Sequence, residues 1–466
     1  MQIPILNGIT TDNKGNFRNS FPKNLVPVAG QNGIADGYLR PAPGIVYLGT
    51  GPGIDRGGIN WNGVYYRVMG SKLVSIDQTG AYTEIGDVGA GDQVTIVYSF
   101  DYLAVASNND LFLYDGSTLT QVTDTDLGTV LDLIWIDGYF MTTDGEFLVV
   151  TELNNPFSVN PLKYGSSEAD PDPIKSLKTI RNEAYAANRY TVEVFDNVGG
   201  DGFPFRRIEG AQIEKGTIGK HTTTVFMEHL VFLGSGRNEA LAVYMAQNGT
   251  TIKLSDREID LQLKEYTEAE LSLVILESKV SDNHNHLLIK LPDQTLVYDA
   301  TASIKVKEPV WFVLHSGLEQ IEEYRAQNFI RCYDKWLVAD PQSAQHGYLV
   351  DDIGSHYGIE ISTEFGTTII YNKGKGLIIN SLELVALTGN VALNADPTIW
   401  TQYSLDGRTW SQPKGIKSGK QGDRKKRLVW IQQAGMRNFR MQRFKGTSES
   451  HLTYTRLELE VETLYV

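Results

Sequence analysis

The chain has 466 residues, of which 41% are apolar and 21% charged, and its net charge is −14. The apolar fraction is too high for a disordered chain, and no run approaches the ~18 consecutive apolar residues of a membrane helix. The single cysteine, Cys332, excludes an intrachain disulfide and a cysteine-based zinc site, which fits a reducing compartment.

The two ends of the chain differ in composition. Residues 1–16 (MQIPILNGITTDNKGN) lack the basic and apolar regions of a secretory signal, so we expect none. Residues 401–466 hold 13 Lys and Arg against 6 Asp and Glu, a net +7, which leaves −21 for the first 400 residues. An acidic body with a basic C-terminal module indicates a polarity that can guide docking.

Residues 1–60 are rich in turn-forming residues and too irregular for a repeated sheet unit. They end in the segments 37–45 (GYLRPAPGI) and 47–53 (YLGTGPG). We predict that 1–60 form an N-terminal arm, or platform segment, that is ordered by packing on something else.

A recurrent hairpin organises the middle of the chain: two alternating runs with Gly, Asn, Asp or Pro at the turn between them. It occurs at residues 65–76, 102–114, 139–150, 184–195, 230–244, 287–298 and 336–350. Further alternating pieces at 94–97, 131–136 and 176–180 can supply inner strands.

Successive hairpins are spaced by roughly 36 to 57 residues, which is near the blade length of a four-stranded propeller repeat. Small twisted sheets stacked in a ring bury their faces against each other and protect all but short edges. The chain is therefore predicted to be all-β, with a β-propeller of six or seven blades over residues 61–365. An array of β-sandwiches is the alternative.

One segment near 256–280 breaks this rhythm. Asp256 and Thr267 are suited to cap helix N-termini, and Glu270 completes a capping-box pattern with Thr267. We predict one or two helices inserted between blades.

Residues 366–466 show longer alternating runs, which predict a separate C-terminal β module resembling a β-sandwich. The expected strands are 367–371, 376–388, 398–404, 428–432, 439–444 and 452–462.

Several stretches, in order along most of the chain, resemble a known family: the tail hub, or packaged-DNA stabilisation protein, of short-tailed (podovirus) phages of the lambdoid Salmonella type. They are 37–45 (GYLRPAPGI), 66–73 (YRVMGSKL), 86–90 (GDVGA), 216–219 (GTIG), 266–271 (YTEAEL), 287–300 (LLIKLPDQTLVYDA) and 311–318 (WFVLHSGL). The last hundred residues match least well.

The resemblance implies a structural virion protein that is not an enzyme and uses no cofactor. It implies a hexameric ring, or nozzle, of identical subunits below the portal and its head–tail adaptor ring. Such a ring extends the DNA channel, keeps packaged DNA in the capsid until ejection, and supports the tail needle and the tailspikes. The implied location is the virion tail, assembled in the host cytoplasm, with double-stranded DNA passing through without sequence-specific binding and with no membrane contact.

A propeller lectin or carbohydrate-binding surface protein is the alternative function. A lectin exposes aromatic side chains at equivalent positions of its blades. The aromatic residues that open the hairpins here are expected to fill the core between blades instead: Tyr102, Tyr139, Tyr185 and Trp336.

Three segments suggest catalytic or metal-binding sites, and each favours a structural interpretation instead. The segment 404–410 (SLDGRTW) is near the Asp-box of sialidases, but one residue too short, and predicts a turn. Glu168, Asp170 and Asp172 predict a solvated acidic loop rather than a calcium site. His284 and His286 form a possible metal pair, but with only Asp282 nearby they favour a turn, so no metal is expected.

The basic C-terminal run is the best candidate for docking on a partner. A Gly-rich loop and the strand pattern after it carry eight basic residues that we predict to dock: Lys417, Lys420, Arg424, Lys425, Lys426, Arg427, Arg437 and Arg440. Arg443 follows on the same strand pattern. Docking on an acidic partner or neighbouring subunit is favoured over direct contact with DNA phosphates and over a merely solvated loop.

Overall fold

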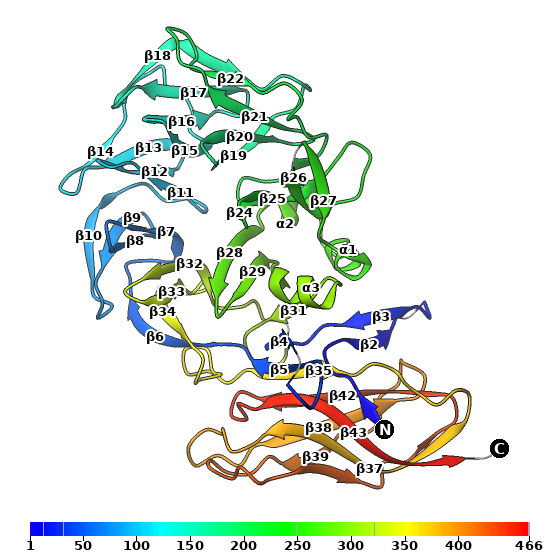
Figure 1. Ribbon diagram of the computed structural model, residues 1–466. Helices are drawn as coiled ribbons and strands as arrows, with labels where there is room; N and C mark the ends of the chain where they lie inside the picture. Colours follow the sequence, from blue (N-terminus) through cyan, green and yellow to red (C-terminus); the bar gives the residue numbers. More distant parts are fainter. Residues whose placement is uncertain (13, 31, 248, 321, 465–466) are drawn as a thin grey trace.

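A ring of small sheets and a two-sheet sandwich make up the molecule (Figure 1). The computed structural model describes residues 1–12, 14–30, 32–247, 249–320 and 322–464. Among these residues, no helix is long and apolar enough to cross a membrane. The first and last described strands, β1 (Gln2–Ile3) and β43 (Thr453–Leu464), pair with each other in the sandwich (Figure 1).

The described residues form a seven-bladed propeller, which confirms the predicted fold class. The first four blades, each written from the innermost strand outward, are β7 (Asp55–Trp61), β8 (Val64–Met69), β9 (Lys72–Ile76) and β10 (Tyr82–Asp87); β11 (Thr95–Tyr98), β12 (Leu103–Ser107), β13 (Asp110–Tyr114) and β14 (Leu119–Gln121); β15 (Asp132–Ile136), β16 (Tyr139–Thr143), β17 (Phe147–Glu152) and β18 (Asn155–Ser166); and β19 (Ile174–Ile180), β20 (Glu183–Asn188), β21 (Val192–Asn197) and β22 (Phe205–Arg207).

The fifth blade has two short inner strands, β23 (Gly216–Thr217) and β24 (Thr223–Phe226), which both pair with the same neighbour. The remaining strands of blades five to seven are β25 (His229–Ser235), β26 (Ala242–Gln247) and β27 (Thr250–Lys253); β28 (Ile275–Ser281), β29 (His284–Lys290), β30 (Thr295–Asp299) and β31 (Trp311–Leu314); and β32 (Gln327–Cys332), β33 (Lys335–Ala339), β34 (Gln345–Val350) and β6 (Gly44–Thr50).

The innermost strands contact each other in a closed ring, from β7 through β11, β15, β19, β24, β28 and β32 back to β7. Each of the seven predicted hairpins supplies the two middle strands of one blade. The apolar faces of neighbouring blades form the core, as the packing of Tyr139 with Leu177 and Phe195 between blades three and four illustrates. Tyr102 and Tyr185 are partly buried against the neighbouring core clusters.

The ring closes through strands that are far apart in the sequence. Strand β6 is the outermost strand of the last blade and pairs antiparallel with β34. Without β6 the seventh blade would have three strands and an open edge, which sheets tend to protect.

The C-terminal module is a sandwich of two sheets, as predicted. One sheet runs β4 (Leu25–Ala29), β5 (Gly37–Pro41), β43 (Thr453–Leu464), β37 (Gly376–Leu387) and β40 (Leu428–Ile431), with β1 (Gln2–Ile3) on β43 and β41 (Gly435–Met436) on β37. The other runs β35 (Ser362–Gly366), β42 (Phe439–Thr447), β38 (Thr398–Ser404) and β39 (Lys414–Lys417), with β36 (Ile370–Tyr371) on β42. Leu382 and Leu457 of the first sheet pack with Ile399 and Phe444 of the second.

The expected arm at 1–60 is not one unit in the structure. Strands β1, β4 and β5 extend a sandwich sheet, β6 completes blade seven and β7 begins blade one, so this segment is divided between both modules. The hairpin of β2 (Gly8–Thr11) and β3 (Phe17–Ser20) lies between them, where Ile9 N donates to Thr367 O and Arg18 forms an ion pair with Glu258. These strands find their hydrogen-bond partners in distant segments, which composition does not reveal.

Three helices are present in the described residues. The predicted caps are confirmed: Asp256 caps α1 (Arg257–Leu263), and Thr267 forms a capping box with Glu270 at α2 (Glu268–Ser272). The expected helical insertion to 280 is too long, because β28 pairs with β29 along its whole length from Ile275. The third helix, α3 (Ala300–Val306), follows β30 and was not predicted.

Candidate docking surfaces and a buried histidine cluster

The basic segment predicted to dock lies in the loop between β39 and β40 of the sandwich. Within the described residues, Lys420, Arg424, Lys425 and Lys426 are exposed and form no ion pair. Arg427 is also exposed, but its guanidinium binds both carboxylate oxygens of Glu383 at 2.8 and 2.5 Å. This loop therefore presents a group of four cations that form no ion pair with a carboxylate of the described residues.

Lys417 and Arg437 are exposed at the sides of this module. The Lys417 ammonium donates a hydrogen bond to Asp396 O at 2.6 Å, and Arg437 lies between β41 and β42. Both remain accessible to a partner.

Arg440 is not part of the docking surface, contrary to the prediction. Its side chain is fully buried, with Nε donating to Gln442 Oε1 at 3.0 Å, Nη1 donating to Gln433 O at 2.5 Å, and the guanidinium over the Tyr403 ring. Burial lowers the pKa of this guanidinium to about 10. Arg443 is half-buried, donates to Gln402 and lies over Trp410, so it too supports the sandwich.

One end of the propeller axis is apolar. A cavity of about 650 Å³ opens at the carboxyl ends of the inner strands and is lined by Tyr98, Phe100 and Trp135 among others. The Phe100 ring is 88% exposed and meets Trp135 edge to face. This mouth offers aromatic contact area to a partner.

The opposite end of the axis is polar. A cavity of about 690 Å³ at the amino ends of the inner strands is lined by Arg56, Asp92, Lys175 and Lys220 among others. Between the two mouths, buried Asp132 accepts hydrogen bonds from Thr95, Ser176 and the Leu177 amide, which ties three inner strands together. Hydrogen bonds to Asp132 thus hold the inner strands of these three blades together near the propeller axis.

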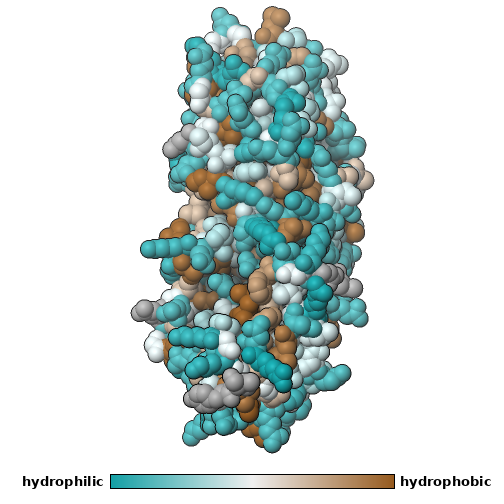
Figure 2. Space-filling view, turned by 90° about the vertical axis from the view of Figure 1, so that its right-hand side faces the viewer, coloured by the Kyte–Doolittle hydropathy of each residue, from teal (hydrophilic) through white to brown (hydrophobic). Residues whose placement is uncertain are grey.

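Figure 2 shows the side of the molecule to the right of Figure 1. Its outline is elongated, and apolar side chains appear in small groups separated by hydrophilic ones.

The segment 404–410 and the acidic loop around Asp170 form turns and local contacts. Asp406 Oδ1 accepts hydrogen bonds from the amides of Arg408 and Thr409 at 2.8 Å, so the segment 404–410 forms the expected turn. In the acidic loop, Asp170 pairs with Arg237, and Asp172 accepts from the Tyr190 and Thr191 amides.

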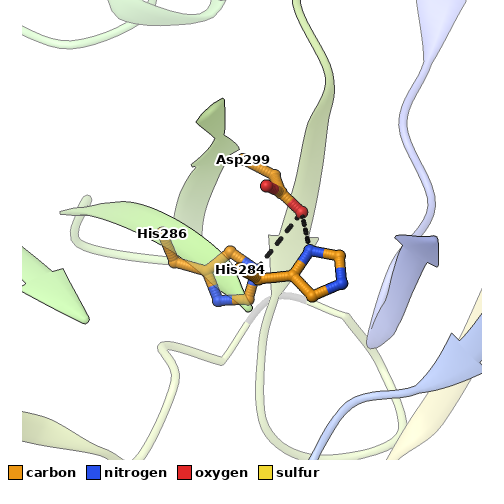
Figure 3. Close-up of side chains that lie close together, drawn as sticks. All are labelled: His284, His286 and Asp299. Carbon is orange, nitrogen blue, oxygen red and sulfur yellow. Dashed lines mark hydrogen bonds and ion pairs between the residues drawn. The ribbon is translucent and has the colours of Figure 1, made fainter. Parts of the chain in front are cut away.

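A buried cluster of His284, His286 and Asp299 lies in blade six (Figure 3). The histidines alternate along β29, and Asp299 at the end of β30 lies opposite His286 in the sheet register. Asp299 Oδ2 is 2.5 Å from His284 Nδ1 and 3.5 Å from His286 Nε2. The nearby acid expected from the sequence, Asp282, instead pairs with Arg40 at 3.2 Å.

Comparison with known proteins covers both modules. A family model described as Bacteriophage P22 Gp10, beta-propeller, matches residues 1–354, and one described as Bacteriophage P22 Gp10, beta-sandwich, matches residues 362–462. The tail hub protein gp10 of Salmonella phage P22 is 26% identical over 483 aligned positions, which cover 99% of each chain.

Similar solved structures include the Pan2 WD40 domain of Neurospora crassa, with a TM-score of 0.42, 10% identity and coverage of 66% of this chain and 95% of that one. The N-terminal domain of Nup159 has a TM-score of 0.42 and 9% identity, and covers 71% of this chain and 98% of that one.

Proposed function

Because the chain belongs to the family of phage P22 Gp10, we propose that it forms the ring-shaped hub, or nozzle, of a short phage tail. It has a structural role in a phage tail hub and is a component of the virion tail; the family is not enzymatic. The observation that carries the proposal is the match to a tail hub protein across 99% of both chains, propeller and sandwich alike.

The finer proposal is that identical subunits, six to a ring, sit below the portal and its adaptor ring. There they extend the DNA channel, retain the packaged DNA, and support the needle and the tailspikes. A closed symmetric ring repeats each contact around its axis, so modest interfaces add up to firm attachment. The propeller and the sandwich supply separate faces for such contacts.

Charge fits this arrangement. A channel that passes DNA should not bind it tightly, and the first 400 residues carry −21. Like charges repel the duplex and let it slide. The basic loop of the sandwich is then suited to an acidic protein surface on the adaptor or on a neighbouring subunit.

The test of this function is assembly with the portal–adaptor complex of a short-tailed phage. Light scattering coupled to size exclusion measures the mass of the purified chain alone and after mixing. A closed ring, or a monomer that joins the adaptor in a fixed multiple, supports the hub. A monomer that ignores the adaptor and binds glycans would contradict it and favour the lectin.

The role of the basic loop has its own test in the same assay. A variant with Lys420, Arg424, Lys425 and Lys426 changed to Ser should fail to dock. A charge-matched control changes four exposed cations of the propeller to Ser: Arg206, Lys264, Lys305 and Lys307. Equal docking by both variants would refute the loop's role and leave the hub itself standing.

A further inference from the structure

The buried His284, His286 and Asp299 are placed as ligands are placed in a metal site. We propose that these three side chains bind one divalent transition metal ion, with zinc the best match. Their three donor atoms all lie within 4.8 Å of one another, and all three residues are buried.

The backbone explains why the donors converge. Residues two apart on a strand point to the same face, so both imidazoles of β29 project to one side. Asp299 lies directly opposite His286 on the adjacent strand, which brings its carboxylate to that same side. Figure 3 shows the carboxylate oxygen facing both rings.

The donor set matches zinc chemistry. Two imidazole nitrogens and one carboxylate oxygen are ligands that zinc takes at about 2.0–2.2 Å, with a fourth position open to water. The distances from Asp299 Oδ2 to the two nitrogens, 2.5 and 3.5 Å, require only small side-chain shifts for such a geometry.

The carboxylate is already held in place by a second contact. Asp299 Oδ1 accepts a hydrogen bond from the Ala302 amide at 3.0 Å as the N-cap of α3, which leaves Oδ2 facing the histidines. Outer contacts of this kind fix the orientation of metal ligands. The His286 ring is also confined by the edge of Phe312.

His286 Nε2 provides an independent observation. Within the described residues it is buried and makes no hydrogen bond, and its nearest polar contact, Asp299 Oδ2, lies 3.5 Å away. A buried polar atom that makes no hydrogen bond is costly, and such atoms are few in folded proteins. A metal ion bound at Nε2 would satisfy it.

The positive charge of one neighbouring residue, Lys279, disfavours binding of a metal cation. Lys279 of β28 is buried and lies opposite His286 on the other side of β29, so its ammonium adds positive charge near the site. The carboxylate of Asp299 offsets this charge. This repulsion gives two opposite predictions. Removing the Lys279 charge should tighten metal binding, whereas removing a ligand should weaken it.

The location gives the ion a structural role. Asp299 ends β30 and starts α3, and Ala302 of α3 packs against Ala29 of β4, which belongs to the sandwich. A metal bound here would therefore brace the connection between propeller blade six and the C-terminal sandwich.

The test uses the full-length chain without a histidine tag, stripped with EDTA and titrated with Zn²⁺ by calorimetry and with Co²⁺ by visible absorption. We expect one ion per chain and a higher melting temperature with Zn²⁺. His286→Asn should weaken the affinity at least about tenfold and abolish the Co²⁺ band. Lys279→Met should strengthen binding, and His229→Asn, on β25 outside the cluster, should bind like the wild type.

If circular dichroism shows that His286→Asn does not fold, Asp299→Asn replaces it. Its amide oxygen can still accept the Ala302 hydrogen bond, so the cap is kept while the charged ligand is lost. Absence of stoichiometric binding by the wild type, or equal affinity in the wild type and the ligand variants, would overturn the metal site.

Discussion

Arg67 and Asp55 form an ion pair at 2.5 Å between Arg67 Nη1 and Asp55 Oδ1, with both side chains fully shielded from solvent. They lie in blade one and reach Asn328 of blade seven. Asn328 Nδ2 donates to Asp55 Oδ2 at 2.5 Å, and Arg67 Nη2 donates to Asn328 O at 2.7 Å. The seam of the ring is thus held by buried charges near the axis and by β6 at the rim.

Removing one partner of this pair should destabilise the ring. Asp55→Ala leaves the Arg67 charge buried without a carboxylate, which typically costs about 3–5 kcal/mol. Urea unfolding followed by tryptophan fluorescence measures the loss. Glu84→Gln, which breaks the exposed pair with Lys72, is the control and should barely change the midpoint. Equal midpoints for both variants would contradict the structural role of the seam.

The capping box at α2 should contribute measurably to stability. Thr267→Ala removes the side chain that accepts from the Glu270 amide, at an expected cost of about 1 kcal/mol. Thr267→Ser keeps the hydroxyl and should remain close to the wild type in the same unfolding experiment. A loss of the same size in Thr267→Ser would show that the cap is not the cause.

Arg440 should matter for folding and Arg437 should not. Arg440→Ala leaves Gln433 O and Gln442 without their buried donors and opens space beside Tyr403, so we expect a loss of about 2–4 kcal/mol. Arg437→Ala removes an exposed side chain and should change stability by less than about 0.5 kcal/mol. Chemical unfolding of the two variants measures both changes in stability. Wild-type stability of Arg440→Ala would contradict a structural role for the buried Arg440 side chain.

Acid should lower the stability of the folded chain through the buried His356, which lies in the segment between the propeller and the sandwich. Burial lowers the pKa of His356 to about 3, and its Nδ1 lies 2.7 Å from Ser316 Oγ. The unfolded chain takes up the proton near pH 6.5 whereas the folded chain does not, so stability is full above that pH and is lost as the pH falls below it. The slope for one such group is about 1.4 kcal/mol per pH unit.

The matched experiment compares the wild type with His356→Asn between pH 6.5 and 5. The wild type should lose stability more steeply than the variant by that amount, because the variant lacks the group that titrates. Parallel curves would contradict a neutral buried His356.

How far the sequence predicts this fold depends on the distance between partners. The seven hairpins are local, so alternation and turn residues are enough to find them. Strand β6 precedes the first blade in the sequence but pairs with β34, about 300 residues later, in the last blade. No local pattern in the sequence reveals that pairing.

The same limit applies to the sites. Arg440 and Phe444 are four apart on β42, so they share a face, and placing Phe444 in the core would have placed Arg440 there too. Asp299 joins His284 and His286 only through the pairing of β29 with β30. The charge pattern predicts a docking role for the loop around Lys420, but it does not predict the direction of each side chain.

Retention of packaged DNA is a direct measure of the proposed function of the hub. Phage heads that carry a full genome, portal and adaptor but lack this protein are mixed with the purified chain, and the DNA open to added nuclease is measured. We expect the wild-type chain to seal the heads and protect the DNA, and the variant of Lys420, Arg424, Lys425 and Lys426 to do neither. Equal digestion with and without the wild-type chain would contradict the proposed function.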